Sequence, residues 1–193
     1  MQINTDRLLL RNFMREDVGD AFEYCSQEGV GEMAGWPAHK AIDETEKMLD
    51  EWINNKNIFA IVWKKNGKVI GHLAVNADSE ENRDDTRELG CALNRNYQRR
   101  GIMTEAIRAV LGCFFTNGIA FIWACCFQNN AASKGMIEKC GFSFQQEGTF
   151  YAKRLDKTFP SYEYRMTREE WRRCHVGQYY IKMQERLNNA DWE

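Results

Sequence analysis

The chain has little proline and no excess of basic residues. Its 193 residues include only two prolines, and no linker, internal repeat or low-complexity tract divides them. The 26 Lys and Arg residues are matched by 28 Asp and Glu residues, which gives a formal net charge of -2 at pH 7. Because a nucleic-acid-binding domain usually carries a clear basic excess, this balance argues against a nucleic-acid partner. The 44% hydrophobic content suits one globular domain.

Long hydrophobic runs and a leader sequence are also missing. The most apolar stretch, residues 112–127, is interrupted by Thr116 and Asn117, whereas a transmembrane helix needs roughly 20 continuous apolar residues. The first seven residues contain no basic segment followed by an apolar core, which a secretory signal requires. We therefore expect a cytoplasmic protein with no membrane partner.

The cysteines follow neither the pattern of a disulfide framework nor that of a zinc site. There are seven of them, an odd number, and no Cys-x-x-Cys spacing occurs. The three histidines are scattered without the spacing of metal ligands. Buried free thiols in a reducing compartment explain this pattern better, so we expect no metal.

Hydrophobic periodicity in the first half predicts strands and helices in alternation. We expect a strand at 7–13, helices at 16–26 and 43–54, strands at 59–63, 69–75 and 88–93, and a charged loop at 78–87. Asp43, with Glu46 three residues later, marks the start of the second helix. Asn66-Gly67 supplies the positive φ angles of a tight turn between the second and third strands.

The second half predicts a longer helix, a buried strand and a short helix before the last two strands. The expected ranges are a helix from 103 closed by Asn117-Gly118, a strand at 119–127, a short helix capped by Asn130 and ended by Gly141, strands from 142 and at 161–166, and a helical segment from 167. This order indicates a mixed α/β (α+β) fold with a largely antiparallel sheet.

One short motif lies where the fourth strand passes into a helix. It reads Gln98-Arg99-Arg100-Gly101-Ile102-Met103. The start of a helix presents unpaired N–H groups and a partial positive charge, and a glycine there lets a phosphate approach closely. The motif is therefore suited to bind a pyrophosphate. The same residues are also typical of a plain strand-to-helix turn that needs a glycine and binds no ligand.

Four separated motifs resemble the GNAT superfamily of N-acetyltransferases. Gln-x-x-Gly-x-x at 98–103 is similar to its acetyl-coenzyme A signature, and Asn130-Ala-Ala-Ser133 with 137–142 resembles its second cofactor-side motif. Residues 5–11 and 164–171 are similar to the branch that contains the ribosomal-protein N-terminal acetyltransferases of the RimJ and RimL type. The resemblance implies one domain over 1–171, with a strongly twisted mixed sheet that splays between its fourth and fifth strands and is flanked by helices. A helical extension would follow over 172–193.

The resemblance also implies the donor and the residues that hold it. Acetyl-coenzyme A would lie with its pantetheine arm along the splayed strand. The implied cofactor-binding residues are Leu93, Asn94, Gln98, Arg99, Arg100, Gly101, Ile102, Met103, Thr104, Asn130 and Ser133. Two positions depart from the family pattern. Met103 replaces a small residue, which is harmless if its side chain turns into the core, and Ile137 replaces the tyrosine that often protonates the leaving thiolate.

Three residues are candidates for catalysis. Glu88, two residues before Gly90 on the fourth strand, could take the proton that an ammonium must lose before attack, or could be a solvent-facing glutamate. Ser133 and Asn130 are the candidates on the leaving-group side, although both fit simple helix capping. The cysteines need not act as nucleophiles, because the reaction implied is direct attack by the amine in a ternary complex.

The resemblance also implies that the acceptor is a primary amine, on a protein N-terminus or a small molecule. Its binding is expected from the loops at 29–39 and 151–161, with Trp36 as either a platform for the acceptor or a lid on the core. Aromatic residues in 172–193 suggest a helix that packs on the domain or in a possible homodimer. The alternatives to an enzyme are an acetyl-coenzyme A sensor without turnover and an interaction module.

Overall fold

The computed structural model describes residues 2–77 and 83–174, and within them eight strands form one sheet. The strand order is β1-β2-β3-β4-β5-β6-β8-β7. The strands are β1 (Ile3–Asn4), β2 (Leu8–Asn12), β3 (Ile58–Trp63), β4 (Lys68–Asn76), β5 (Thr86–Leu93), β6 (Phe121–Phe127), β7 (Ser143–Ala152) and β8 (Lys157–Thr167). The helices are α1 (Val18–Cys25), α2 (Ile42–Asn54), α3 (Ile102–Thr116), α4 (Ala131–Cys140) and α5 (Arg168–Arg173), with short 3-10 turns at Arg15–Asp17, Glu32–Ala34 and Arg95–Tyr97.

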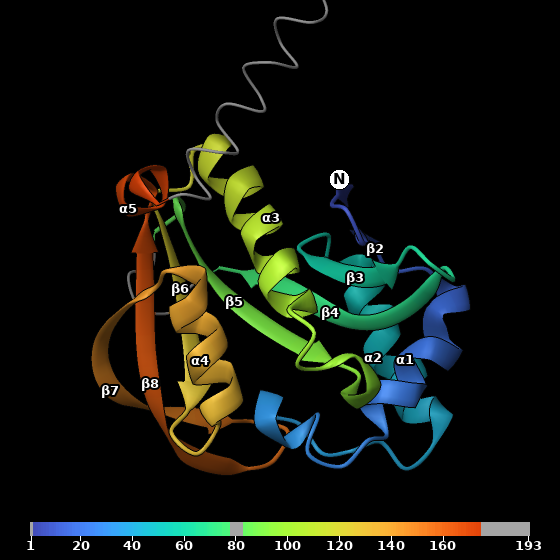
Figure 1. Ribbon diagram of the computed structural model, residues 1–193. Coiled ribbons are helices and arrows are strands. Elements are labelled where there is room, and N and C mark those ends of the chain that lie inside the picture. The colour runs from blue at the N-terminus through green and yellow to red at the C-terminus, as the bar shows by residue number, and fades with distance from the viewer. Residues whose placement is uncertain (1, 78–82, 175–193) are drawn as a thin grey trace, which may run out of the picture.

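The sheet is antiparallel except at one junction, where it also splays. β5 and β6 pair in parallel from Thr86 and Phe121 to Leu89 and Ala124. Beyond that point β5 continues beside β4 as far as Leu93, and β6 continues beside β8 as far as Phe127. In Figure 1 the two strands diverge toward their carboxyl ends. The fourth and fifth strands predicted from the sequence are β5 and β6, so the predicted splay between them is confirmed.

Helices cover the two faces of the sheet differently. α3 and α4 lie on one face, over a core that includes Leu89, Ile107 and Ile137. α1 and α2 lie on the other face, over β2 to β5, and form a second core with residues such as Ala92. Because side chains alternate along a strand, Leu89 and Ala92 of β5 serve opposite faces.

The turns and helix starts differ from the predictions in three places. In the β3–β4 hairpin only Gly67 has a positive φ angle, 73°, and its N–H bonds to the Trp63 carbonyl at 3.0 Å, so the turn is longer than a two-residue type I′ turn. α2 starts at Ile42, and Asp43 lies inside its first turn. The predicted loop at 151–161 is mostly strand, since β7 and β8 extend into it as a hairpin.

Both ends of α4 and the final helix follow the sequence signals. Asn130 caps α4 and Gly141 ends it with a φ of 96°. α5 runs to Arg173, across the predicted domain boundary at 171, and the predicted extension over 172–193 lies almost wholly outside the described residues. Among the helices of 2–77 and 83–174, none is both long enough and apolar enough to cross a membrane.

Candidate active site

The splayed end of β5 directs backbone groups into the gap. The Asn94 N–H donates to the Ile70 carbonyl of β4 at 2.8 Å, which fixes the alternation of the ladder. Since alternate residues of an antiparallel strand face the partner, Cys91 and Leu93 point their N–H and C=O groups toward the gap. The Leu93 carbonyl there accepts the Gln98 side-chain amide at 2.9 Å. The two Cys91 groups and the Leu93 N–H form an edge that an extended ligand could join like a strand.

The start of α3 lies beside this edge and carries outward-facing amides. The first bond of the helix runs from the Glu105 N–H to the Gly101 carbonyl at 3.0 Å, so the N–H groups of Ile102 to Thr104 precede it. Gly101 has a φ of 70° and Arg99 a φ of 59°, which bend the chain into the helix. The side chains of Ile102, Met103 and Thr104 are buried. Met103 therefore turns into the core, as its position requires.

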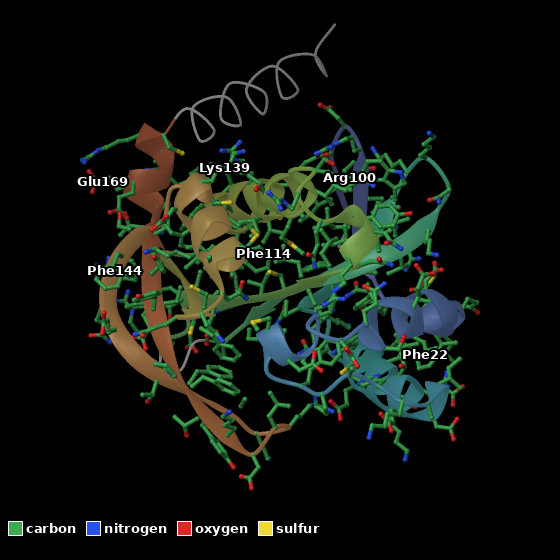
Figure 2. The ribbon with its side chains drawn as sticks, turned by 60° about the horizontal axis from the view of Figure 1, so that its bottom comes forward. Phe22, Arg100, Phe114, Lys139, Phe144 and Glu169 are labelled. Carbon is green, nitrogen blue, oxygen red and sulfur yellow. The ribbon has the colours of Figure 1, made fainter. Side chains whose placement is uncertain are left out.

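Two arginines give the same helix start mobile positive charge. Arg99 and Arg100 are exposed, and the Arg100 guanidinium lies 5.6 Å from the centre of the Tyr97 ring. Figure 2 shows Arg100 close to the first turn of α3. The acidic residue of that turn, Glu105, is neutralised, because Arg7 donates to it from Nε at 2.6 Å. Burial disfavours the Glu105 carboxylate, but bonds from Thr5 and Arg7 outweigh this and lower its pKa.

Asn94 and Gln98 hold the loop before α3 in place. The Asn94 side chain is fully buried, accepts a bond from Gln27 Nε2 at 3.1 Å and donates to Glu23 Oε1 at 2.8 Å. It faces α1, so any contact of Asn94 with a ligand in the gap would come from its backbone. Gln98 uses its amide on the Leu93 carbonyl. The sequence motif marked both positions but gave no sign of these partners.

The start of α4 lies at the same edge of the sheet as the start of α3 (Figure 1). Asn130 Oδ1 accepts the Ser133 N–H at 3.0 Å, so the capping interpretation of Asn130 is confirmed. Ser133 is half-buried in the first turn. One turn later Ile137 is only 3% exposed and belongs to the core. Asn130 and Ser133 are thus two half-buried polar side chains at this end of the helix.

A cavity of about 250 Å³ lies where β5, β6, β8 and β7 run side by side. Its lining residues are Glu88, Trp123, Ala124, Cys125, Thr149, Phe150, Tyr151 and Glu163. Glu88 pairs with Trp123, one position before the last β5–β6 pair. Glu88 alternates with the core residue Leu89, so its side chain is on the sheet face opposite α3 and α4. The structure therefore gives the predicted base a place in a cavity next to the splay.

Glu163 is a second carboxylate of this cavity, and the sequence analysis missed it. It pairs with Cys125 across β6 and β8, and it accepts a bond from Gln146 Nε2 at 2.7 Å. A signal did exist: Glu163 alternates with the core residue Tyr164 along a predicted strand, which puts it on the face opposite the core. Without knowing that β8 lies next to β6, that pattern indicates only a solvent-facing residue.

The thiols near the gap are protonated at neutral pH. Burial raises the pKa of Cys125 to about 12, and the carboxylates of Glu88 and Glu163 act in the same direction. Burial also raises the pKa of Cys91 to about 12 and that of Cys140 to about 11. Because the thiolate is the nucleophile, these residues are poorly suited to form a covalent acyl intermediate.

Trp36 lies in the core rather than on the surface of the cavity. It is 7% exposed, packs on Gly31, and its ring centre is 5.3 Å from that of His39. This burial favours the interpretation of Trp36 as a lid on the core over its interpretation as a platform for the acceptor. The same loop reaches the cavity wall, since a Cβ on Gly35 would lie 3.3 Å from the Phe150 ring.

A family model and a curated relative match most of this chain. Residues 7–143 match the model described as an acetyltransferase (GNAT) domain. An uncharacterized N-acetyltransferase of Bacillus subtilis, YnaD, is 30% identical over 183 residues, which span 89% of this chain and 99% of that protein.

Solved structures share the fold at lower identity. A GNAT-family acetyltransferase from Bacillus anthracis gives a TM-score of 0.77 at 24% identity, and the match covers 88% of this chain and 99% of that one. RimL, a ribosomal L7/L12 α-N-protein acetyltransferase in complex with coenzyme A, gives a TM-score of 0.71 at 18% identity, with 86% and 98% covered. The open mixed sheet, the domain match and the curated relative lead to one conclusion: the chain belongs to the GNAT family of acetyltransferases.

Proposed function

We propose that the chain transfers the acetyl group of acetyl-coenzyme A to a primary amine by direct attack in a ternary complex. One observation carries this proposal. The β5–β6 gap has two helix starts on one side of the sheet and a carboxylate-lined cavity on the other. A donor in the gap and an amine in the cavity would thus meet at the same point.

The residues around the gap fit acetyl-coenzyme A. The Cys91 and Leu93 backbone groups suit the amides of the pantetheine arm, and the N–H groups of Ile102 to Thr104 suit the pyrophosphate. Arg99 and Arg100 add the charge that a pyrophosphate needs. RimL, which shares the fold, is known in complex with coenzyme A. When bound, acetyl-coenzyme A supplies a thioester carbonyl that an amine can attack.

Glu88 acts in this proposal as the proton acceptor, directly or through a water. An ammonium with a pKa of roughly 8 to 10 must lose a proton before its nitrogen can attack. The nitrogen then forms a bond to the acetyl carbon, the carbon–sulfur bond breaks, and the thiolate takes up a proton. Ser133 and Asn130, at the start of α4, are the proposed residues on the thiolate side.

The acceptor is proposed at the level of chemistry, as a protein N-terminus or a small-molecule amine. RimL acts on a ribosomal protein N-terminus, as its name states, and shares this fold. Action in the cytoplasm is consistent with seven free thiols.

A second candidate function is an acetyl-coenzyme A sensor without turnover. Ile137 favours it, because a buried isoleucine at this position cannot protonate a leaving thiolate. The two candidates share the donor site and differ only in the chemistry that follows.

Mass spectrometry of acetyl transfer separates the two. The full chain would be incubated with acetyl-coenzyme A and a panel of peptides with N-terminal Ser, Ala, Thr or Met, polyamines, amino acids and aminoglycosides. A mass increase of one acetyl group on one class of amine would support the enzyme. Bound coenzyme A with no product from any amine of the panel would favour the sensor.

A further inference from the structure

Glu163 carries a negative charge that the described residues do not neutralise. Its carboxylate is half-buried and lines the cavity, and its hydrogen-bond donor there is the neutral amide of Gln146, at 2.7 Å. Within residues 2–77 and 83–174 it forms no ion pair. The cationic Arg165, two residues away, instead lies over the rings of Phe121 and Trp123, at 5.1 and 5.5 Å. A carboxylate left in this state favours a cation from outside the chain.

The neighbouring strand makes room for this carboxylate. Gly148 of β7 pairs with Ser161 of β8, and a Cβ on Gly148 would overlap Glu163 Oε1. Every residue type other than glycine would therefore displace the carboxylate from its place in the cavity. Gly148 does not have a positive φ angle, so its backbone conformation does not require glycine. The space that it leaves for Glu163 does require one.

Glu163 and Glu88 lie on the same sheet face, at opposite sides of Cys125. Glu88 pairs with Trp123 of β6, and Glu163 pairs with Cys125 of β6. Two strand spacings and two residues along the strand separate their Cα atoms by roughly 12 Å in a regular sheet, and both side chains can reach inward. The negative charges of both carboxylates help to raise the pKa of the Cys125 thiol, which lies between them.

Part of the wall of this cavity is aromatic. Trp123, Phe150 and Tyr151 line the cavity together with Glu88 and Glu163. Aromatic rings pack against methylene groups and also attract ammonium groups to their faces. The cavity therefore combines two anionic groups with aromatic surface that suits a short alkyl chain.

We infer that the acceptor is a diamine or linear polyamine, in which one amine is presented to Glu88 and a second ammonium group is held by Glu163. This inference rests on the proposed function and names its substrate class. In this assignment Glu163 binds the acceptor and Gly148 positions the Glu163 carboxylate. A monoamine of the same length would lack the second charge and would bind more weakly.

Calorimetric titration of the coenzyme A-bound protein tests this assignment without requiring turnover. The probes are 1,4-diaminobutane, spermidine and butylamine, titrated into the wild type, Glu163→Gln and Gly148→Ala. The matched control is Glu147→Gln, which removes the same charge from an exposed side chain one residue before Gly148 and on the opposite sheet face. We expect the wild type to bind the diamine roughly 10- to 100-fold more tightly than butylamine, as for a hydrogen bond between charged groups.

Glu163→Gln should lose that preference while its affinity for butylamine stays the same. Gly148→Ala should lower the affinity for the diamine, although it changes no charge. Glu147→Gln should behave as the wild type. Equal affinity of the wild type for diamine and monoamine would overturn the inference, as would an unchanged preference in Glu163→Gln. Acetylation by the wild type is measured separately: a diamine that binds with this pattern but is never acetylated would contradict the proposed function and leave the diamine site supported.

Discussion

Glu88 lies where the paired part of β5 meets the splayed part. Its partner Trp123 is one step before the last pair, so its backbone is held by the sheet while its side chain reaches the cavity. A base in this position is fixed by its strand and still close to the gap. Burial raises the pKa of the neighbouring Cys125 thiol to about 12, so this thiol is poorly suited to act in place of Glu88.

Glu88→Gln should lower kcat by roughly 100-fold or more, the usual contribution of a general base. The loss should be largest at low pH, where the amine arrives protonated, and should shrink as rising pH deprotonates the amine in solution. Acetyl-coenzyme A affinity should stay the same. Steady-state rates from pH 6 to pH 10 would check this, with Glu147→Gln as the control for lost charge. A pH–rate profile with the wild-type shape would remove Glu88 as the base.

The sequence predicted a residue's role correctly where that role depends only on the residue's position in its own helix. Met103 turns into the core and Asn130 caps α4, and both follow from positions within one element. Asn94 could not be understood in this way, because its partner Glu23 is 71 residues away in the chain. Glu163 was missed for a related reason, since its importance comes from the neighbouring strands β6 and β7.

At the scale of elements, one feature places both helix starts at the gap. β5, α3 and β6 form a parallel crossover, which brings the carboxyl ends of β5 and β6 to the same edge. α3 and α4 each follow one of these strands, so both start there (Figure 1). The order of elements predicted a largely antiparallel mixed sheet, and the resemblance to the family implied the splay. The bounds of β7 and β8 were harder to predict, because their hairpin extends through residues that read as a loop.

Asn130 should contribute to stability through the cap and to turnover through its place at the gap. Asn130→Ala should lower the free energy of unfolding by about 1 kcal/mol, the usual effect of a lost N-cap. Asn130→Asp keeps an acceptor for the Ser133 N–H and should stay close to wild-type stability. Urea unfolding with Asn129→Ala as an exposed control measures the first effect. Equal stability of Asn130→Ala and wild type would contradict the capping role.

If Asn130 also serves the leaving group, Asn130→Asp should lower kcat at unchanged stability. Wild-type kcat in that variant would limit Asn130 to capping.

At the scale of the whole molecule, the core under α1 and α2 has buried polar side chains beside its apolar ones. The core under α1 and α2 contains His72, whose Nδ1 lies 3.1 Å from the hydroxyl of Tyr24 and whose ring centre lies 4.4 Å from that of Trp52. Burial lowers the pKa of His72 to about 4. Burial also lowers the pKa of His39, at the edge of the same core. The sequence showed these histidines only as scattered residues without metal spacing.

The free energy of unfolding should therefore fall as pH falls from about 6.5 to about 4. The unfolded chain binds a proton at His72 near pH 6.5, whereas the folded chain resists it until about pH 4. Above pH 6.5 the His72 ring is neutral in both the folded and the unfolded chain, so it does not change the free energy of unfolding as pH varies. By about pH 4 the loss of unfolding free energy that His72 causes reaches about 3 kcal/mol. His72→Gln should be less stable at pH 7 but should lose less on acidification. Urea unfolding at pH 7, 6 and 5 checks this, and parallel curves for variant and wild type would contradict it.

The central claim is that the donor joins the splayed edge of β5, and amide hydrogen exchange by NMR tests it most directly. The exchange of individual amides would be compared in the free protein and with coenzyme A. With coenzyme A at 100 times its Kd, we predict slowing of up to about 100-fold at the Cys91 and Leu93 amides and at Ile102 to Thr104. The Ala92 amide, which faces β4, should change little. Tight binding of coenzyme A that leaves the Cys91 and Leu93 amides at their free rates would contradict the account.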